Sequence, residues 1–248
     1  MPRNGTEVAD SIHRLTNGVS NFYLIEENGK LILVDAGAPK DWARLTRAVT
    51  ALGRRVADLD AVILTHAHSD HTGFAEQART TAGARVWVAA RDSEMARTGK
   101  VGPRDGKTTA YLLRPAFYRT LWILALGGAT KIIPVREVST FGDGETLDVP
   151  GRPRAVYAPG HTPGSAALFF ESRRVLLTGD ALVTHNPLTG RVGPQIMPSG
   201  LNSDSAQALR SLDNLADMTA DVLLAGHGEP WTDGVAAAVG RAKAAGTS

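Results

Sequence analysis

Three histidines and one aspartate lie within six residues of one another, in the run Thr65-His66-Ala67-His68-Ser69-Asp70-His71. Imidazole nitrogens and carboxylate oxygens bind zinc, manganese and iron in proteins, at distances of about 2.0–2.2 Å. Residues two apart on an extended backbone project to the same side, so His66, His68 and Asp70 can converge while His71 turns toward a neighbouring point. The spacing predicts a metal-binding loop that can serve two metal centres.

Three further candidate ligands each follow an apolar run that is typical of a buried strand. They are His161 after residues 155–160, Asp180 after 175–179 and His227 after 222–226, just as the loop at 65–73 follows the run at 60–64. Ligands gather at the carboxyl ends of strands in sheets of this kind, so these side chains are expected to lie together. The chain has no cysteine, and no thiolate takes part.

Four motifs, in this order, resemble those of the metallo-β-lactamase fold hydrolases. They are Thr-His-Ala-His-Ser-Asp-His at 65–71, Gly-His-Thr-Pro-Gly at 160–164, Thr-Gly-Asp at 178–180 and Gly-His-Gly at 226–228. Together they span most of the chain. The resemblance implies an α/β fold, a four-layer αββα sandwich with a binuclear metal site on one edge.

The resemblance also implies how the candidate ligands divide. His66, His68 and His161 would hold one metal, Asp70, His71 and His227 the other, and Asp180 would bridge the two. An aspartate that matches Asp35 supports the metal loop from beneath in this family, and an ordinary turn residue is the alternative for Asp35. His185 is a candidate for substrate contact or for an outer-shell base, and a plain surface residue is its alternative.

Two divalent metal ions are expected. Zinc is the default because the ligand set and the affinity order favour it, with manganese or iron as alternatives. Two cations that share a bridging water lower its pKa from about 15.7 toward about 7, so a hydroxide can attack a carbonyl or phosphorus centre at neutral pH. The expected catalytic residues are Asp180, which holds the metal pair together, and Asp70, which passes a proton to the leaving group.

We expect a metal-dependent hydrolase that cleaves an ester, lactone or thioester of a partly apolar small molecule. The alternatives are a phosphodiesterase or nuclease of the same fold, a mononuclear iron sulfur dioxygenase, and a non-catalytic metal-containing binding protein. Penicillin hydrolysis is disfavoured, because β-lactamases of this fold place Cys or Ser where this chain has Asp180.

A single domain is expected over residues 1–248, since α/β folds of this size are routinely single. Asn28-Gly29 between two apolar runs predicts a hairpin. Further expected elements are helices at 39–52, 73–82, 203–215 and 234–245, strands at 60–65, 85–89 and 221–225, a turn and a strand within 141–149, a hairpin of 166–170 with 174–178, and an irregular stretch at 181–203.

The segment at about 98–130 is expected to be a helical insertion that can cover the active site. Residues 108–126 form a helix-like span that is broken by Pro115 and is apolar on most of its faces. Three interpretations stay open, namely a core helix, a lid over the metal pocket, and an interface with a second copy or a membrane surface. A homodimer would form through residues 108–128.

The formal net charge is only +2 although the sequence pI is about 9.0. Such a slight and scattered excess does not predict a nucleic-acid partner, so a small-molecule substrate is expected. The sequence shows neither an apolar signal core near its N-terminus nor an apolar stretch long enough to span a bilayer. A cytoplasmic location is the resulting expectation.

Overall fold

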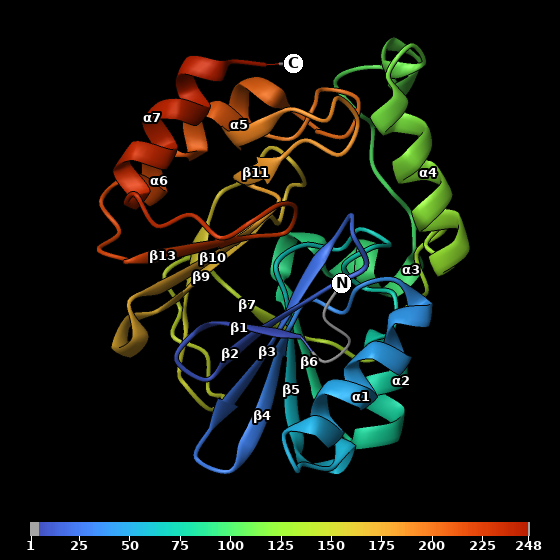
Figure 1. Cartoon of the computed structure of the whole chain (residues 1–248), viewed down its shortest axis with the longest axis vertical. Coiled ribbons are helices and arrows are strands. Elements are labelled where there is room, and N and C mark those ends of the chain that lie inside the picture. The colour runs from blue at the N-terminus through green and yellow to red at the C-terminus, as the bar shows by residue number, and fades with distance from the viewer. Residues whose placement is uncertain (1–4, 248) are drawn as a thin grey trace.

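The computed structural model describes residues 5–247, which form the expected single-domain αββα sandwich (Figure 1). The first sheet has seven strands in chain order: β1 (Thr6–Ala9), β2 (Ile12–Thr16), β3 (Asn21–Glu27), β4 (Lys30–Val34), β5 (Leu59–Leu64), β6 (Arg85–Ala89) and β7 (Ser139–Phe141). The second sheet has the order β13 (Val222–Ala225), β10 (Val175–Gly179), β9 (Ala166–Phe170) and β8 (Arg154–Tyr157).

Helices cover the outer face of each sheet. The first sheet is covered by α1 (Trp42–Ala51), α2 (Ala75–Ala82) and α3 (Ser93–Thr98), and the second by α5 (Ser205–Ser211), α6 (Asp213–Ala216) and α7 (Val235–Ala245). Three separate apolar cores lie between the four layers. In β4, Leu31 and Leu33 face the helices while Ile32 and Val34 face the second sheet, all fully buried. The period of two in a strand explains how one sheet serves two cores.

The hairpin expected at Asn28-Gly29 is confirmed. Both residues have positive φ, 49° and 81°, between the antiparallel strands β3 and β4. Positive φ at both central positions is the pattern of the type I′ turn, which suits the twist of the flanking strands. This hairpin joins β2, on its β3 side, to β5, on its β4 side, within the first sheet.

The parallel strands place the candidate ligands at one edge of the sandwich. In the first sheet β4, β5 and β6 are parallel, and the loop from Thr65 follows the carboxyl end of β5. In the second sheet β10 is parallel to β13, and both β8 and β10 are antiparallel to β9. Strands β8, β10 and β13 therefore end on the same side, where His161, Asp180 and His227 follow them.

Two expectations about irregular segments are wrong. Of the turn and strand expected at 141–149, the turn is present at Asp143 and Gly144, but the strand is wrong, because beyond the turn only one isolated bridge forms, from Thr146 to Arg154. The stretch at 181–203 contains a small hairpin of β11 (Val183–His185) and β12 (Val192–Gln195). The side chain of Asn186 accepts hydrogen bonds from Leu188 N and Thr189 N and so shapes the turn.

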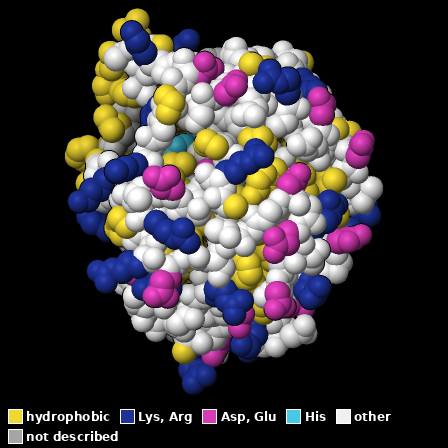
Figure 2. Space-filling model, turned by 180° about the vertical axis from the view of Figure 1, so that it is seen from behind, with side chains coloured by type: hydrophobic (Ala, Val, Ile, Leu, Met, Phe, Trp, Pro, Cys, Tyr) yellow, Lys and Arg dark blue, Asp and Glu magenta, His cyan; other side chains and the backbone are white. Residues whose placement is uncertain are grey.

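The segment at 98–130 contains a helix, but this is not a core helix. Pro115 begins helix α4 (Pro115–Gly127) at its first turn, where its missing N–H costs nothing, instead of interrupting a longer helix. Thr120 is the one buried residue within α4. The helix stands at the side of the sandwich in Figure 1, and apolar side chains gather at the corresponding upper left edge of Figure 2. None of the helices formed by residues 5–247 has the length and apolar character needed to cross a bilayer.

Candidate metal centre

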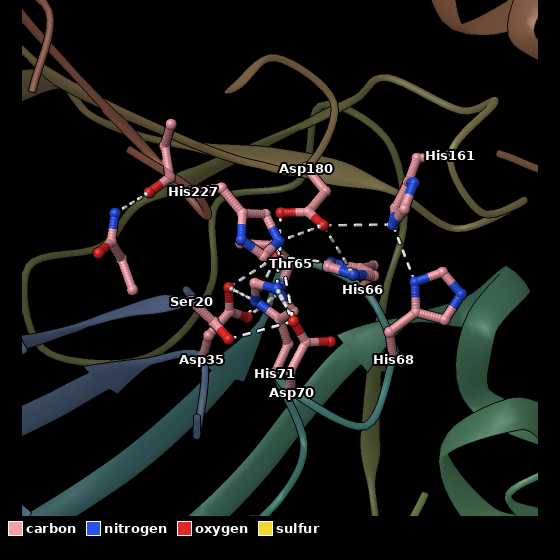
Figure 3. A network of polar contacts seen from close by, with 12 residues as sticks. Ser20, Asp35, Thr65, His66, His68, Asp70, His71, His161, Asp180 and His227 are labelled. Carbon is pink, nitrogen blue, oxygen red and sulfur yellow. Dashed lines mark hydrogen bonds and ion pairs between the residues drawn. The ribbon is translucent and has the colours of Figure 1, made fainter. Parts of the chain in front are cut away.

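The seven candidate ligands converge on one another across the two sheets (Figure 3). They fall into three overlapping groups in which the candidate ligand atoms lie within 4.8 Å of one another: His66, His68 and His161; His66, His71 and Asp180; and Asp70, His71 and His227. The first and third groups are the two triads that the sequence resemblance implies. The structure thus brings together all seven residues from four separate segments.

Asp180 lies between the two triads. Its Oδ2 is 3.4 Å from His161 Nε2 and 3.7 Å from His66 Nε2, on the side of the first triad. On the side of the second, Oδ2 is 3.1 Å from His227 Nε2 and Oδ1 is 3.5 Å from His71 Nε2. One carboxylate therefore faces nitrogens of both triads, which is the position that a bridging ligand requires.

The chemistry of these atoms fits bound cations. Among the described residues, His66 Nε2, His71 Nε2 and Asp180 Oδ1 are fully buried and have no hydrogen-bond partner. Buried polar atoms without such partners cost free energy and are rare in native proteins. All three point into the same cluster, and nitrogen and oxygen donors are ligands for divalent transition metals. The His and Asp groups of this site suit divalent metal binding.

Asp35 supports the loop from beneath. Its carboxylate accepts hydrogen bonds from Thr65 N (2.8 Å), Thr65 Oγ1 (2.9 Å) and His71 Nδ1 (2.9 Å). Because Thr65 Oγ1 donates to Asp35, it can accept from His66 Nδ1 at 3.1 Å. Asp35 has a φ of 61°, a conformation that costs a non-glycine residue roughly 1–2 kcal/mol. These contacts turn the Nε2 lone pairs of both imidazoles toward the cluster.

The sequence did not point to the partners of the other two buried imidazoles. His161 Nδ1 donates to Asn202 Oδ1 at 3.1 Å, and His227 Nδ1 donates to the Val19 carbonyl at 2.7 Å. Ser20 Oγ donates to Asp70 Oδ2 at 3.1 Å. Val19 and Ser20 belong to the loop between β2 and β3, far from any motif in the sequence, and only the folded chain brings them to the site.

A second buried carboxylate, Asp92, joins the two ligand-bearing loops. It accepts hydrogen bonds from Ala67 N (3.1 Å), Thr162 Oγ1 (2.7 Å) and Gly164 N (2.7 Å). Burial raises the pKa of the Asp92 carboxyl and these three donors oppose that rise. Asp92 lies just beyond the carboxyl end of β6, and that position was the one signal available in the sequence. It fixes the loop of His68 against the loop of His161.

Backbone at the centre is tightly packed as well. A Cβ on Gly226 would lie 2.1 Å from Asp180 Oδ1 and 2.9 Å from His71 Cε1. The residue before His227 therefore has to be glycine, because any side chain would displace Asp180.

The electrostatics of the centre differ between the two triads, because the pKa values of His66, His68 and His161 are lowered, mainly by burial, while those of His71 and His227 are raised, against the effect of burial, by the nearby carboxylates. Burial would lower the pKa of His71, but Asp180, Asp70 and Asp35 outweigh burial and raise it to about 10. Burial would raise the pKa of Asp180, but His227 and His71 hold it well below its usual range. Burial, followed by the charge of His161, lowers the pKa of His68 to about 3. Without a metal, the carboxylates retain a proton on His71 in the place of a cation.

His185 lies near the centre but outside the three groups. Its backbone N–H donates to the His227 carbonyl at 3.3 Å, and burial together with the charges of His227 and Arg119 lowers the pKa of its side chain. The His185 side chain is not one of the described residues that line the pocket opening onto the cluster. A contact between His185 and substrate stays a prediction.

The family model described as "Metallo-beta-lactamase superfamily" matches residues 15–227 of this chain. The chain belongs to the metallo-β-lactamase superfamily. The match begins in β2 and ends at His227, so it includes every candidate ligand. Membership confirms the resemblance drawn from the four motifs.

Related proteins of this superfamily include named hydrolases. The chain is 28% identical over 242 residues to "Probable metallo-hydrolase YflN" of Bacillus subtilis, covering 92% of this chain and 88% of that protein. It is 25% identical over 186 residues to "Hydroxyacylglutathione hydrolase GloC" of Haemophilus influenzae, covering 73% and 76%. The solved metallo-beta-lactamase family protein TTHA1429 of Thermus thermophilus is 28% identical, with a TM-score of 0.68 and coverage of 96% and 80%. These findings support a metal-dependent hydrolase.

A pocket of about 570 Å³ opens onto the cluster. Its floor includes His68, Asp70, His161, Asp180 and His227. Its wall is mostly apolar and is formed in large part by helix α4, through Phe117, Thr120, Leu121, Leu124 and Ala125. The pocket therefore combines a polar floor with an apolar wall, the usual composition of a small-molecule site.

Proposed function

We propose that this protein is a binuclear metal-dependent hydrolase that cleaves an ester, lactone or thioester bond of a partly apolar small molecule. The observation that carries the proposal is the position of Asp180 between two complete triads on the floor of a pocket with an apolar wall. The relative named as a hydroxyacylglutathione hydrolase supports including thioesters among the candidate bonds.

The seven candidate ligands would bind two metal ions, with one ligand shared. His66, His68 and His161 would hold one metal and Asp70, His71 and His227 the other, with Asp180 shared, and zinc fits this ligand set best. Two divalent cations in this position supply Lewis acidity and lower the pKa of water enough for hydroxide to form near neutral pH.

Asp70 is the group in the best position to move a proton. Its side chain is 14% exposed and lines the pocket, whereas the Asp180 side chain is 2% exposed. Ser20 Oγ donates to Asp70 Oδ2 and so holds the carboxylate in one orientation. Asp70 would accept the proton of the attacking water and return it to the leaving alkoxide or thiolate.

Helix α4 would act as the lid of the site. Its inner face presents Phe117, Leu121 and Leu124 to the pocket, and Thr120 Oγ1 anchors it by donating to the Pro187 carbonyl at 2.6 Å. An apolar wall next to a charged floor suits a substrate whose reactive carbonyl sits at the end of an apolar group.

The test is a turnover panel on protein purified without chelator and loaded with zinc. It compares aryl esters, acyl lactones and acyl thioesters with bis-p-nitrophenyl phosphate, and the Asp70→Asn variant controls for contaminating activity. We expect turnover of at least one carbonyl class, faster than of the phosphodiester and lost in the variant. Faster cleavage of the phosphodiester would overturn the bond class, and no turnover of any compound would overturn hydrolysis of this kind.

A further inference from the structure

The outer face of helix α4 is apolar and exposed. Tyr118, Trp122 and Leu126 follow one another at four-residue spacing and are 54%, 67% and 54% exposed, and Leu113, just before the helix, is 94% exposed. Figure 2 shows yellow side chains gathered along the corresponding edge of the molecule. Helices that are apolar on all sides are normally buried, and a contiguous exposed apolar patch marks an interaction surface.

The fold itself does not account for this outer face. The opposite face of α4, with Phe117, Thr120 and Leu124, already lines the pocket. The helix therefore has two apolar faces, of which the pocket uses one. The outer face needs a different explanation.

The segment that carries α4 is also strongly basic. Residues 98–131 contain six cationic side chains and one anionic side chain, Asp105, which gives a formal net charge of +5. The cations are Lys100, Arg104, Lys107, Arg114, Arg119 and Lys131. Since the whole chain has a net charge of +2, the rest of it has −3. None of the six forms an ion pair with an acidic side chain among residues 5–247.

We propose that this segment docks onto an anionic lipid surface, with α4 lying in the plane of the headgroups. Tryptophan and tyrosine favour the boundary between headgroups and acyl chains, and leucine favours the acyl side. Lysine and arginine beside such a helix are attracted to anionic headgroups. With 13 residues, α4 is too short to span a bilayer but suits this orientation.

The charges favour a lipid surface over a second copy of this chain. A two-fold dimer through α4 would place the same patch against itself. The cations of one copy would then face those of the other, with only Asp105 on each side to offset them. Arg104 and Lys131 line the pocket and Arg119 donates to the Gly18 carbonyl, so the cations left for an anionic surface are Lys100, Lys107 and Arg114, beside the apolar face.

The docking is tested with phosphatidylcholine vesicles prepared with and without phosphatidylglycerol. The full-length chain is expected to co-sediment with the anionic vesicles only, and to be released by high salt, which screens the charges. Trp122 is an internal reporter, because it is exposed whereas Trp42, Trp87 and Trp231 are buried or half-buried. Its fluorescence should shift to shorter wavelength on binding. Since vesicle binding requires no turnover, this result is independent of the proposed hydrolysis.

Two matched pairs of variants separate docking from general effects. Trp122→Asp should weaken vesicle binding by at least about tenfold, while Val192→Asp, at a residue that is 80% exposed on β12, should leave it unchanged. Arg114→Gln should weaken binding roughly fivefold, and Arg210→Gln on α5 should not. Circular dichroism verifies that each variant is folded, and none of the four residues lines the pocket.

Two results would overturn the proposal. The first is a failure of the vesicle test, which is either no binding to anionic vesicles or equal losses in the test and control variants. The second is a concentration-dependent dimer in analytical ultracentrifugation that Trp122→Asp dissociates, without vesicle binding, which would assign the patch to a second copy of this chain.

Discussion

Among single residues, Asp35 has a left-handed backbone conformation, and its hydrogen bonds to Thr65 and His71 explain why. Its left-handed backbone directs the carboxylate at Thr65 and His71, and so orients two imidazoles at once. We predict that Asp35→Asn weakens metal binding by roughly 10- to 100-fold, as is typical when the hydrogen-bond partner of a ligand is lost. Competition with a chromophoric chelator measures the affinity. Exposed Asp10→Asn is the control, and an unchanged affinity in Asp35→Asn would remove the supporting role.

Asp92 has a different position, between the loop of His68 and the loop of His161. In Asp92→Asn the amide NH₂ must face at least one of the donors Ala67 N, Thr162 Oγ1 and Gly164 N. Because that donor is then buried without a partner, we predict a loss of about 2 kcal/mol in the free energy of unfolding. Urea denaturation measures it, with exposed Asp148→Asn as the control. A loss no larger than that of the control would show that Asp92 does not join the loops.

The candidate ligands could be predicted from the sequence, whereas most of the residues that hydrogen-bond to them could not. The seven candidate ligands were predictable because each lies in a loop that directly follows an apolar run, and parallel strands end on the same side of a sheet. Asp92, Asn202 and Val19 contact the ligand-bearing segments only after folding, from distant parts of the chain. Asn202 follows no apolar run and Val19 acts through its backbone carbonyl, so no local pattern indicated either of them, and the position of Asp92 beyond β6 was the one signal in the sequence.

Among the elements, helix α4 shows that the periodicity of a sequence can predict a helix without predicting where that helix lies in the fold. Its apolar pattern correctly predicted a helix, but the same pattern fits a core helix, a lid and an interface, because periodicity does not specify which partner covers a face. The structure excludes the core and shows one face on the pocket. Similarly, the hairpin of β11 and β12 was missed because its strands are short and its turn depends on the Asn186 side chain.

The two faces of α4 predict different effects of the same substitution. Leu124 lines the pocket, whereas Leu126 points outward. For an ester with an apolar acyl group, we predict that Leu124→Ala raises KM about tenfold, since buried methylene groups contribute about 0.8 kcal/mol each. Leu126→Ala should leave KM in solution unchanged. Steady-state kinetics on acyl esters of increasing length measure the difference, and equal effects in both variants would exclude α4 as a substrate wall.

For the whole molecule, the ionisation of the centre predicts how the stability of metal-free protein depends on pH. The pKa of His71 rises to about 10 from an unfolded value of about 6.5, so its contribution is complete below about pH 6.5 and is lost as pH approaches 10. The pKa of His68 falls to about 3, so its contribution increases with pH from about 3 to about 6.5. We therefore predict maximal stability near pH 6.5.

Urea denaturation of metal-free protein at a series of pH values tests this prediction. Above the maximum, stability should fall by up to about 1.4 kcal/mol per pH unit, the limit for release of one proton. Metal-loaded protein is the control, because the metal displaces the proton of His71 and should remove the decline. Constant stability of the metal-free protein between about pH 7 and pH 9 would contradict the raised pKa.

In the proposed centre, two metals share Asp180. The most direct test is metal content by plasma mass spectrometry on protein purified without chelator, compared between wild type and Asp180→Ala. Removing the carboxylate that faces both triads would leave each of two bound metals one ligand short. We predict about two equivalents of zinc in the wild type and a clear loss in the variant. A single equivalent of iron that is unaffected by Asp180→Ala would contradict the bridged site and favour oxygen-dependent chemistry instead.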